Sequence, residues 1–402
     1  MNSKPLPLGE AIALMLPYLK PLASEEKPLL DCLGLRSAED CFAQWPQPPF
    51  DNAMMDGFAV RSADTQQPGA DLLVVARQPA GRARNLKCGP GEAVRIFTGA
   101  PMPEGADAVV MQEDCELTGA RVRCLVSATA GEFVRRQGSE VCIGQRLVHR
   151  GQRLTAARIG LLASQGCSHH RVIPQAKVLV VSTGDELRAP GAGPLLPGEI
   201  YESAATMLRA QIAGWGLPMP EGGHCGDHPR ALAEWLGQSC NHCDVVVICG
   251  GVSVGEHDPV KPALQQLGIE PILWRIQLKP GKPFLFAKQQ RPQGGSTLIF
   301  GLPGNPVSAF VTAELLLRPT LMSMQGNTDW NPERQTVVLA EELSNPGDRP
   351  HYLRGKVEGG MFYAVGLQQS HALFGLSQCN ALLALAPGQS LAQGHPVEVL
   401  PC

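Results

Sequence analysis

The hydrophobic residues between Lys177 and Ala309 recur as short β-branched runs, each followed by a polar loop that contains glycine. Continuous apolar runs of this length are typical of strands buried on both faces of a parallel sheet. The four stretches read KVLVVSTGDEL (177–187), DVVVICGGVSVGEHD (244–258), WRIQLKPGKPF (274–284) and TLIFGLPGNPVSAF (297–310). We therefore expect a central domain in which parallel strands alternate with helices.

Three helices of this domain are predicted from their start signals. In three places a proline follows, by one or two positions, a residue whose side-chain oxygen can cap a helix. The pairs are Asp227 and Pro229, Asp258 and Pro259, and Asn305 and Pro306. Such an oxygen accepts a hydrogen bond from the first helical turn, and proline fits the first helical position. We expect a helix to begin at each of these sites.

The flanking regions follow other patterns. Apolar residues have helical spacing from Pro7 to about Leu19 and at about 156–165, and residues 27–40 are expected to form a short helical or turn region. Short strands separated by glycine and proline occupy the rest. The predicted fold is a multidomain α/β protein with a mixed N-terminal linker domain (1–44 plus 143–173), a β-rich inserted domain (45–142), a parallel-sheet α/β domain (174–322) and a small C-terminal β-barrel or sandwich (323–402).

Composition narrows the class of protein. The length of 402 residues exceeds what one hydrophobic core usually supports, which agrees with several domains. The 34 basic and 37 acidic residues give a formal net charge of −3, which argues against non-specific nucleic-acid binding. No apolar run approaches the roughly 18 residues of a membrane span, and the N-terminus lacks the pattern of a signal peptide. We expect a cytoplasmic protein with no membrane or nucleic-acid partner.

The 13 cysteines are scattered and odd in number, as free thiols of a reducing cytosol would be. Cys240 and Cys243 form the one close pair in the sequence, directly before the strand at 244–249. A zinc or redox site is one interpretation of this pair. No second pair stands at ligand spacing, which favours ordinary cysteines at a helix end.

The carboxyl ends of parallel strands meet at one edge of a sheet, where ligands bind. We expect that edge to collect Gly184, Asp185, Glu186, Gly250, Gly251, Ser253, Gly255, Asp258, Lys279, Lys282, Pro303 and Asn305. Glycine lets backbone N–H groups approach an anion, lysine neutralises it, and carboxylates hold a divalent cation. The set predicts a site for a phosphorylated ligand and a metal ion.

Each loop also has a simpler interpretation. The two acids of STGDEL suit the first turn of a helix, and a lysine pair such as that of KPGKP is usually solvated. Asp258 is an expected N-cap, and it can also bind a ligand only if its two oxygens divide the work. No single loop is specific evidence for such a ligand site, but the four loops in this order are. The chain lacks a P-loop, a dinucleotide-binding G-x-G-x-x-G and a serine nucleophile elbow, which disfavours the enzymes that use them.

The ordered loops STGDEL, GGVSVGEHD, KPGKP and GLPGNPVSA resemble those of the molybdenum insertases of molybdenum-cofactor biosynthesis (molybdopterin molybdenumtransferases). DNAMMDGFAVR (51–61) and RIFTGAPMPEGADAVVMQED (95–114) are similar to two further motifs of that family. Arg349, Arg354-Gly355 and QSH (369–371) also correspond to family positions. The resemblance covers nearly the whole chain, and the combination is very specific.

The resemblance implies a homodimer of four-domain subunits, in which the central domain binds adenylylated molybdopterin and the β-rich domain reaches across the dimer to complete the site. The implied reaction inserts molybdate into the dithiolene of this substrate with Mg²⁺-dependent loss of AMP. A molybdopterin adenylyltransferase and molybdoenzyme maturation factors are the implied partners. The family's functional positions fall on Asp56, Thr98, Glu186, Asp227, Asp258, Lys279, Lys282, Pro303, Pro306 and Ser370. Among these, Asp56, Thr98, Glu186 and Asp258 are the expected catalytic residues, and Glu186, Asp258 and Glu140 are the expected metal ligands.

The chain departs from the family pattern at three places. Gly138-Ser139-Glu140 stands where the family has G-E-D, so Glu140 is expected to replace the aspartate with a longer reach. Tyr201-Glu202-Ser203-Ala204 lacks the amide of Y-[DN]-[ST]-N, which puts a ligand contact at Ala204 in doubt. His228 replaces a second acid after Asp227. Asp56 and Thr98 also have local interpretations, as a turn residue and a strand-end cap.

Three functions other than the insertion of molybdate fit the sequence less well. An adenylyltransferase is expected from a free-standing central domain, and the flanking domains argue against it. A scaffold should carry a long linker and a second molybdopterin-binding domain. A non-catalytic carrier should have lost its acids, yet Asp56, Glu186 and Asp258 remain. A preference for tungstate over molybdate stays open.

Overall fold

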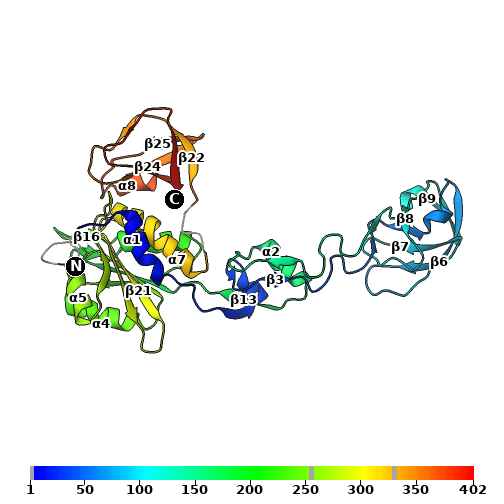
Figure 1. The fold of residues 1–402 in the computed structure, drawn as a ribbon, viewed down its shortest axis with the longest axis horizontal. Helices are drawn as coiled ribbons and strands as arrows, with labels where there is room; N and C mark the ends of the chain where they lie inside the picture. Colours follow the sequence, from blue (N-terminus) through cyan, green and yellow to red (C-terminus); the bar gives the residue numbers. More distant parts are fainter. Residues whose placement is uncertain (1–3, 253–257, 328–332) are drawn as a thin grey trace. The chain divides into compact units, whose positions relative to one another are not determined.

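The computed structural model describes residues 4–252, 258–327 and 333–402. Contacts divide the chain into two compact units, each coloured by sequence in Figure 1. The central unit comprises residues 1–38, 151–154 and 169–402, and the β-rich unit comprises 39–150 and 155–168. The finer domain boundaries predicted from the sequence stay predictions. Within the described ranges, no helix combines the length and apolar character needed to cross a membrane.

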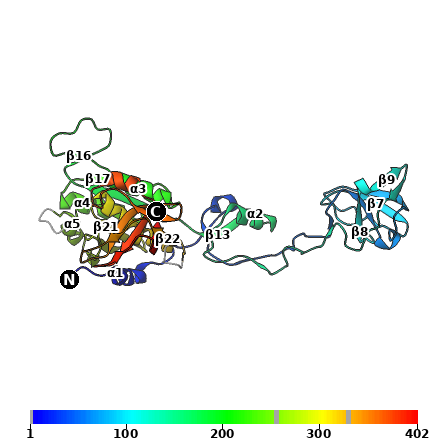
Figure 2. The ribbon, with the colours of Figure 1, turned by 90° about the horizontal axis from the view of Figure 1, so that it is seen from above.

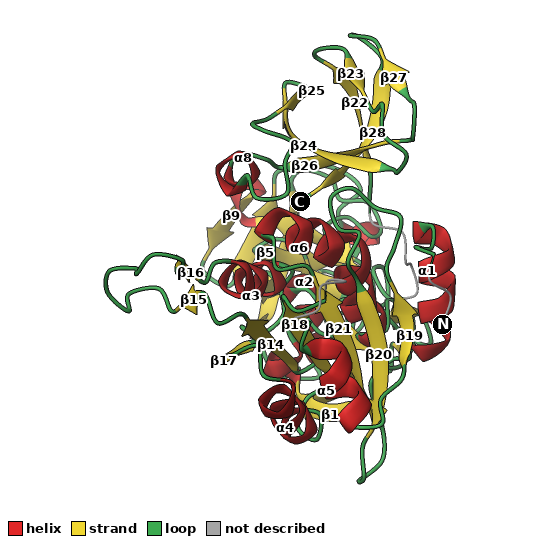
Figure 3. Ribbon diagram, turned by 90° about the vertical axis from the view of Figure 1, so that its left-hand side faces the viewer, coloured by secondary structure: helices red, strands yellow, loops and turns green. Residues whose placement is uncertain are grey.

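A six-stranded sheet forms the core of the central unit, in the order β17-β14-β18-β21-β20-β19 (Figure 3). Its parallel part consists of β17 (Glu221–Cys225), β14 (Val178–Thr183), β18 (Val245–Cys249) and β21 (Ser296–Leu302). The other strands are β20 (Leu285–Gln290), antiparallel to both its neighbours, and β19 (Pro271–Trp274). Every residue of β18 is buried, as the continuous apolar pattern predicts. The predicted parallel α/β domain is confirmed.

Helices cover both faces of this sheet, because alternate strand residues point to opposite sides. Val245 and Val247 share one core with α3 (Ala204–Gly214), α6 (Pro306–Thr312), α7 (Arg318–Met324) and the N-terminal α1 (Leu8–Met15). Val246 and Ile248 share the other core with α4 (Pro229–Ser239) and α5 (Val260–Gln266). A π-helical turn, η5 (Ala313–Leu317), joins α6 to α7.

The helices α4 and α6 begin at the predicted prolines, α5 begins one residue after Pro259, and only Asp258 bonds through its side chain to the first helical turn. Asp258 Oδ1 accepts a hydrogen bond of 3.0 Å from the Val260 N–H. Asn305 is the N-cap of α6 without a side-chain bond, and His228 rather than Asp227 occupies that position before α4. The predicted capping by Asp227 and Asn305 is therefore wrong.

The loop KPGKP does not follow a parallel strand, so that prediction is wrong. Arg275 has a φ of 72°, a left-handed conformation that ends β19, and Ile276 and Lys279 form only isolated bridges. The loop nevertheless reaches the expected edge of the sheet. It precedes antiparallel β20, whose first residue Leu285 pairs with Gly301 near the end of β21.

Smaller elements complete the α/β part of the central unit. Residues 27–40, predicted as helix or turn, contain strand as well, because β1 (Glu25–Pro28) and β2 (Arg36–Ser37) both pair with β13 (His169–Ile173). Short 3₁₀ turns are η1 (Leu16–Tyr18) and η2 (Leu29–Cys32). The strands β15 (Leu187–Arg188) and β16 (Ile200–Tyr201) form the base of the extended loop seen in Figure 2.

The C-terminal region is a barrel and not a sandwich. Its closed barrel has the order β22-β25-β24-β26-β28, and a pair of two-residue strands lies beside it. The bounds are β22 (Gln335–Leu339), β23 (Leu343–Ser344), β24 (His351–Glu358), β25 (Met361–Ala364), β26 (Ala381–Leu385), β27 (Ser390–Leu391) and β28 (Pro396–Pro401). The short helix α8 (Leu373–Ser377) connects β25 to β26.

The β-rich unit is built on a six-stranded sheet in the order β8-β5-β7-β6-β10-β9. Its strands are β5 (Gly57–Val60), β6 (Ala70–Gln78), β7 (Glu92–Ile96), β8 (Ala108–Met111), β9 (Cys115–Thr118) and β10 (Arg121–Cys124). Further elements are β3 (Cys41–Phe42), β4 (Asn52–Ala53), β11 (Val134–Arg135), β12 (Arg146–Val148), η3 (Ser62–Asp64), η4 (Gln112–Asp114) and α2 (Ala156–Ser164).

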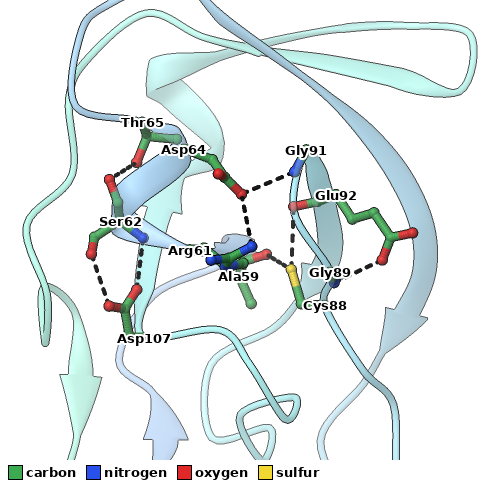
Figure 4. A network of polar contacts seen from close by, with 10 residues as sticks. All are labelled: Ala59, Arg61, Ser62, Asp64, Thr65, Cys88, Gly89, Gly91, Glu92 and Asp107. Atoms are coloured by element: carbon green, nitrogen blue, oxygen red, sulfur yellow. Dashed lines mark hydrogen bonds and ion pairs between the residues drawn. The ribbon is translucent and has the colours of Figure 1, made fainter.

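A network of polar contacts fixes the turns of this unit (Figure 4). The Asp107 carboxylate accepts hydrogen bonds from the Ser62 N–H at 2.7 Å and the Ser62 hydroxyl at 2.8 Å. Asp64 Oδ2 accepts a bond of 2.9 Å from the Gly91 N–H. Because these carboxylates bind backbone donors of the turns, we interpret the network as structural.

Candidate active site

A cavity of about 720 Å³ lies at the carboxyl edge of the parallel strands. This volume is within the range of small-molecule sites. Nine of the predicted residues line it: Gly184, Glu186, Asp227, Gly250, Gly251, Asp258, Pro303, Asn305 and Pro306. Ser253 and Gly255, also predicted, lie outside the described residues. A second cavity, of about 470 Å³ between α1 and β19, contains none of the predicted residues.

The glycines after β18 permit close packing of the loops. Gly250 has a φ of +99°, and a Cβ atom there would lie 2.7 Å from the Thr183 carbonyl oxygen. Gly251 has a φ of +62°, and its Cβ atom would lie 2.9 Å from Thr183 Oγ1. Any side chain would therefore push this loop away from the end of β14. The glycines thus position the wall of the cavity. The sequence predicted only that their backbone N–H groups bind an anion.

Within the described part of the chain, one carboxylate oxygen of Asp258 has a hydrogen-bond partner and the other has none. Oδ1 accepts the Val260 N–H at the start of α5, whereas Oδ2 is buried without a partner among the described residues. Burial raises the pKa of Asp258 to about 6, and the neighbouring Asp227 carboxylate adds to the effect. The first role predicted for Asp258, a bond to the start of a helix, is observed at Oδ1, and its binding of a ligand stays a prediction. A buried acceptor without a protein partner is costly unless a ligand or cation satisfies it.

Two more acids lie near Asp227. Burial raises the pKa of Asp227, and repulsion from the Asp185 and Glu186 carboxylates raises it further. Asp185 does not line the cavity, but its Oδ1 accepts a hydrogen bond of 3.1 Å from the Asp227 N–H. Asp185 therefore positions Asp227. The concentration of negative charge favours a bound cation.

The donor set fits Mg²⁺ only if the substrate supplies further oxygens. Among the described residues, no three His, Cys, Asp or Glu side chains are grouped as metal ligands. Mg²⁺ sites often use one or two carboxylates together with substrate phosphates and water. Asp258, with its unpartnered oxygen, and Glu186 in the same cavity meet that description.

Lys279, Lys282 and Ser370 do not line the cavity. Both lysines are exposed, and Lys279 instead joins its loop to the start of β24. Its N–H donates to the Pro350 carbonyl at 2.9 Å, and its carbonyl accepts from the Tyr352 N–H at 2.8 Å. Within KPGKP only Pro283 contributes to the cavity wall.

His371 lines the cavity although the sequence analysis did not select it as a site residue. Its place in the QSH motif, next to Ser370, was the available signal. Arg354 is 2% exposed and donates to the carbonyl oxygens of Leu367 and, at 2.8 Å, Gln369. The buried guanidinium therefore holds the loop that carries His371. Thr183 also lines the cavity and was not predicted, and its buried Oγ1 has no partner among the described residues.

The departure at residues 201–204 has a structural explanation. The Glu202 carboxylate accepts hydrogen bonds from the Ala205 N–H at 2.6 Å, the Thr206 N–H at 3.1 Å and the Thr206 hydroxyl at 2.7 Å. Glu202 thus caps α3 from outside the helix, and Ser203 makes no side-chain cap bond. Because the Glu202 carboxylate accepts the hydrogen bonds of the Ala205 and Thr206 N–H groups, these groups are not available to a ligand at the start of α3.

In the β-rich unit the structure brings Asp56 and Thr98 together. Asp56 Oδ1 accepts hydrogen bonds from the Thr98 N–H at 2.8 Å and the Thr98 hydroxyl at 2.7 Å. The bond from the Thr98 N–H is the main cause of the lowered pKa of Asp56. Glu140 is exposed in the same unit. The joint metal site of Glu140 with Glu186 and Asp258, which belong to the central unit, stays a prediction.

The pair Cys240 and Cys243 is buried after the end of α4. Burial raises the pKa of Cys240 to about 11 and that of Cys243 to about 12. The Cys243 thiol donates to the Ser239 carbonyl at 3.2 Å. Protonated thiols are poor zinc ligands, so these properties favour the interpretation as ordinary helix-end cysteines.

Comparison with known proteins identifies the family. The family model described as "MoeA N-terminal region (domain I and II)" matches residues 6–166, "Probable molybdopterin binding domain" matches 179–323, and "MoeA C-terminal region (domain IV)" matches 336–402. A relative from Mycobacterium tuberculosis named molybdopterin molybdenumtransferase 2 is 36% identical over 369 residues, 89% of each chain. A molybdopterin molybdenumtransferase from Haemophilus influenzae is 33% identical over 405 residues, 98% of each chain.

A solved structure has the same fold. The molybdopterin biosynthesis moea protein from Pyrococcus horikosii superposes with a TM-score of 0.83 at 30% identity, covering 99% of both chains. The similarity extends over all the regions that carry the sequence motifs. This chain belongs to the molybdopterin molybdenumtransferases, the transferase family of molybdenum-cofactor biosynthesis that its motifs resemble.

Proposed function

We propose that this protein inserts molybdate into adenylylated molybdopterin with Mg²⁺-dependent release of AMP. The observation that carries the proposal is the buried Oδ2 of Asp258, which has no partner among the described residues and lies in a cavity that Glu186 and Asp227 also line. An anion alone would be repelled by these carboxylates. A phosphorylated substrate that arrives with a divalent cation satisfies them.

The cavity walls suit such a ligand in shape and polarity. Gly250 and Gly251 allow close approach to the ends of the strands, and Asn305 and Pro306 place the start of α6 in the wall. The first N–H groups of a helix lack intrahelical partners and attract negative charge. We therefore assign the binding and orientation of the adenylylated substrate to these loops.

Asp258 and Glu186 are the residues we expect to hold Mg²⁺, with Asp227 and Asp185 adding negative charge beside them. Mg²⁺ would supply positive charge to the departing phosphate. Asp258 keeps α5 in place through Oδ1 while Oδ2 is available to the cation. We assign molybdate itself to the exposed lysines Lys279 and Lys282, which are candidates for binding an oxyanion.

Asp56 and Thr98 enter the proposal through a homodimer. We propose that the Asp56–Thr98 pair of one subunit completes the cavity of its partner. The lowered pKa keeps Asp56 anionic, and its bonds to Thr98 fix the direction of the carboxylate. We place the reaction in the cytoplasm, where the 13 free thiols are stable.

Reconstitution tests the proposal. Purified protein receives adenylylated molybdopterin, Mg²⁺ and molybdate, and AMP release and protein-bound molybdenum are followed together. We expect AMP release that depends on molybdate and on Mg²⁺. Tight ligand binding without AMP release would instead identify a carrier, with Glu202, Ala204 and Glu140 as the departures to revert first. Faster AMP release with tungstate would identify a tungstate-preferring insertase.

A further inference from the structure

Two cysteines that are distant in sequence meet at the end of the C-terminal barrel. Cys379 and Cys402 are 23 positions apart, and their Sγ atoms lie 3.9 Å from each other. Cys379 follows α8, and Cys402 follows β28. The Cys402 N–H donates to the Asn380 carbonyl at 2.9 Å, which holds the two segments in register. A disulfide bond requires the sulfurs to approach by roughly 2 Å more, a distance within reach of side-chain rotation.

Solvent reaches both thiols. Cys402 is exposed, and Cys379 is partly exposed. In another close pair, Cys115 and Cys124 of the β-rich unit, which face each other across β9 and β10, Cys124 is buried. In the pair Cys41 and Cys167, burial raises the pKa of Cys41. Neither of these two pairs contains an exposed cysteine, so access favours the pair Cys379–Cys402 for reaction.

Charge around Cys379 favours its thiolate. A hydrogen bond from the Cys402 thiol is the main cause of the lowered pKa of Cys379, and the Arg354 guanidinium contributes to it. Burial and the Glu314 carboxylate oppose the effect. The thiolate is the reactive form of cysteine, and a neighbouring cation is a common way to stabilise it.

We propose that Cys379 and Cys402 form a reversible intramolecular disulfide when the protein reacts with hydrogen peroxide. The Cys379 thiolate attacks the peroxide, an S–O bond forms, the O–O bond breaks, and the leaving hydroxide takes up a proton to become water. The Cys402 thiol then loses its proton and attacks the Cys379 sulfur, an S–S bond forms, the S–O bond breaks, and the leaving hydroxide takes up that proton to become a second water. Two thiols lose two electrons in total, and the peroxide is reduced. In a reducing compartment such a bond is transient and returns to thiols.

The disulfide would restrain a segment that contributes to the cavity. Residues 365–380 connect β25 to β26 and contain the loop with His371, then α8 and Cys379. Arg354 holds this loop through Leu367 and Gln369 and also lies near Cys379. A bond to Cys402 ties the far end of the segment to β28. We therefore expect the oxidised barrel to unfold at a higher temperature than the reduced one.

Peptide mapping of the full chain tests the proposal. The protein is treated with hydrogen peroxide, free thiols are alkylated, and digested peptides are identified by mass spectrometry. We expect a linked peptide containing Cys379 and Cys402, lighter by two hydrogen atoms than the separate peptides, and its loss after dithiothreitol. We also expect the Tm to rise by a few degrees on oxidation and to return on reduction.

Substitutions assign the effect. Cys379→Ser and Cys402→Ser should each abolish the linked peptide and the Tm shift, whereas the matched control Cys142→Ser, at an exposed cysteine elsewhere, should retain both. Recovery of Cys379 and Cys402 as alkylated thiols, as sulfinic acids or in disulfides between chains would overturn the proposal. The wild-type peptide map decides the question even if a serine variant is unstable.

Discussion

Asp258 in the central unit and Asp56 in the β-rich unit are both predicted catalytic carboxylates, yet their surroundings differ. Asp258 has a buried oxygen with no partner in the described part of the chain, and its pKa is raised to about 6. Asp56 Oδ1 accepts two hydrogen bonds from Thr98, and its pKa is lowered. The first carboxylate has an oxygen free for a ligand, whereas the second is satisfied by a residue 42 positions along the chain. The two predicted catalytic aspartates therefore differ: one has an oxygen available for binding, and the other is held anionic and fixed in direction.

The largest expected effect is that of Asp258→Asn. The amide keeps an oxygen for the Val260 N–H but removes the charge offered to a cation. We expect AMP release to fall by about 10²–10³-fold, the scale on which loss of electrostatic stabilisation acts. The Tm of Asp258→Asn should equal that of the wild type or be slightly higher, because a partly buried charge is lost. Asp348→Asn, at a carboxylate whose side chain is 91% exposed, is the control. Normal turnover in Asp258→Asn would remove Asp258 from the site.

Asp56→Asn and Asp56→Ala together separate charge from loop shape. Asparagine can still accept the bonds from Thr98, whereas alanine cannot. If the negative charge of Asp56 takes part in the reaction, Asp56→Asn lowers the turnover rate by about 10²-fold. This is the lower end of the effect expected when a group that acts directly on the reaction is removed. Its Tm and dimerisation should match the wild type. Full activity in Asp56→Asn with loss in Asp56→Ala would leave Asp56 with a structural role only.

Gly250→Ala tests whether the cavity depends on close packing of its loops. The new Cβ atom would lie 2.7 Å from the Thr183 carbonyl oxygen at a φ of +99°. We expect a loss of about 1–3 kcal/mol of unfolding free energy and a weaker affinity for the adenylylated substrate. Gly268→Ala is the matched control, because Gly268 also has a positive φ, +66°, but a Cβ atom there meets nothing within 4 Å. Equal losses in both variants would mean that backbone strain alone explains the effect.

The smallest expected effect is a pH dependence of stability. The pKa of Asp258 rises on folding from an ordinary value near 3.8 to about 6, so between these values the folded chain binds more protons than the unfolded chain. Stability contributed by this proton is present at low pH and is lost as pH rises through about 6. Denaturant unfolding without Mg²⁺ should therefore show wild type losing stability relative to Asp258→Asn between about pH 4 and pH 6.5. A constant difference across that range would contradict the raised pKa.

The sequence by itself determined three parallel strands of the central domain, β14, β18 and β21, and the loops that follow them. Strands buried on both faces need continuous apolar runs, and β14, β18 and β21 have them. The carboxyl edge of these strands then had to collect their loops, which is why nine predicted residues line one cavity. The same local signals placed the helix starts at Pro229 and Pro306, because proline fits the first helical turn.

Only the tertiary structure decided how these groups are used. KPGKP reaches the cavity edge through an antiparallel strand, the oxygens of Asp258 divide between α5 and the cavity, and Cys379 meets Cys402. Each of these facts depends on contacts between segments distant in sequence or on the direction of a single side chain. Periodicity reports which face of an element is buried, but it carries no information on which distant atom a side chain will meet.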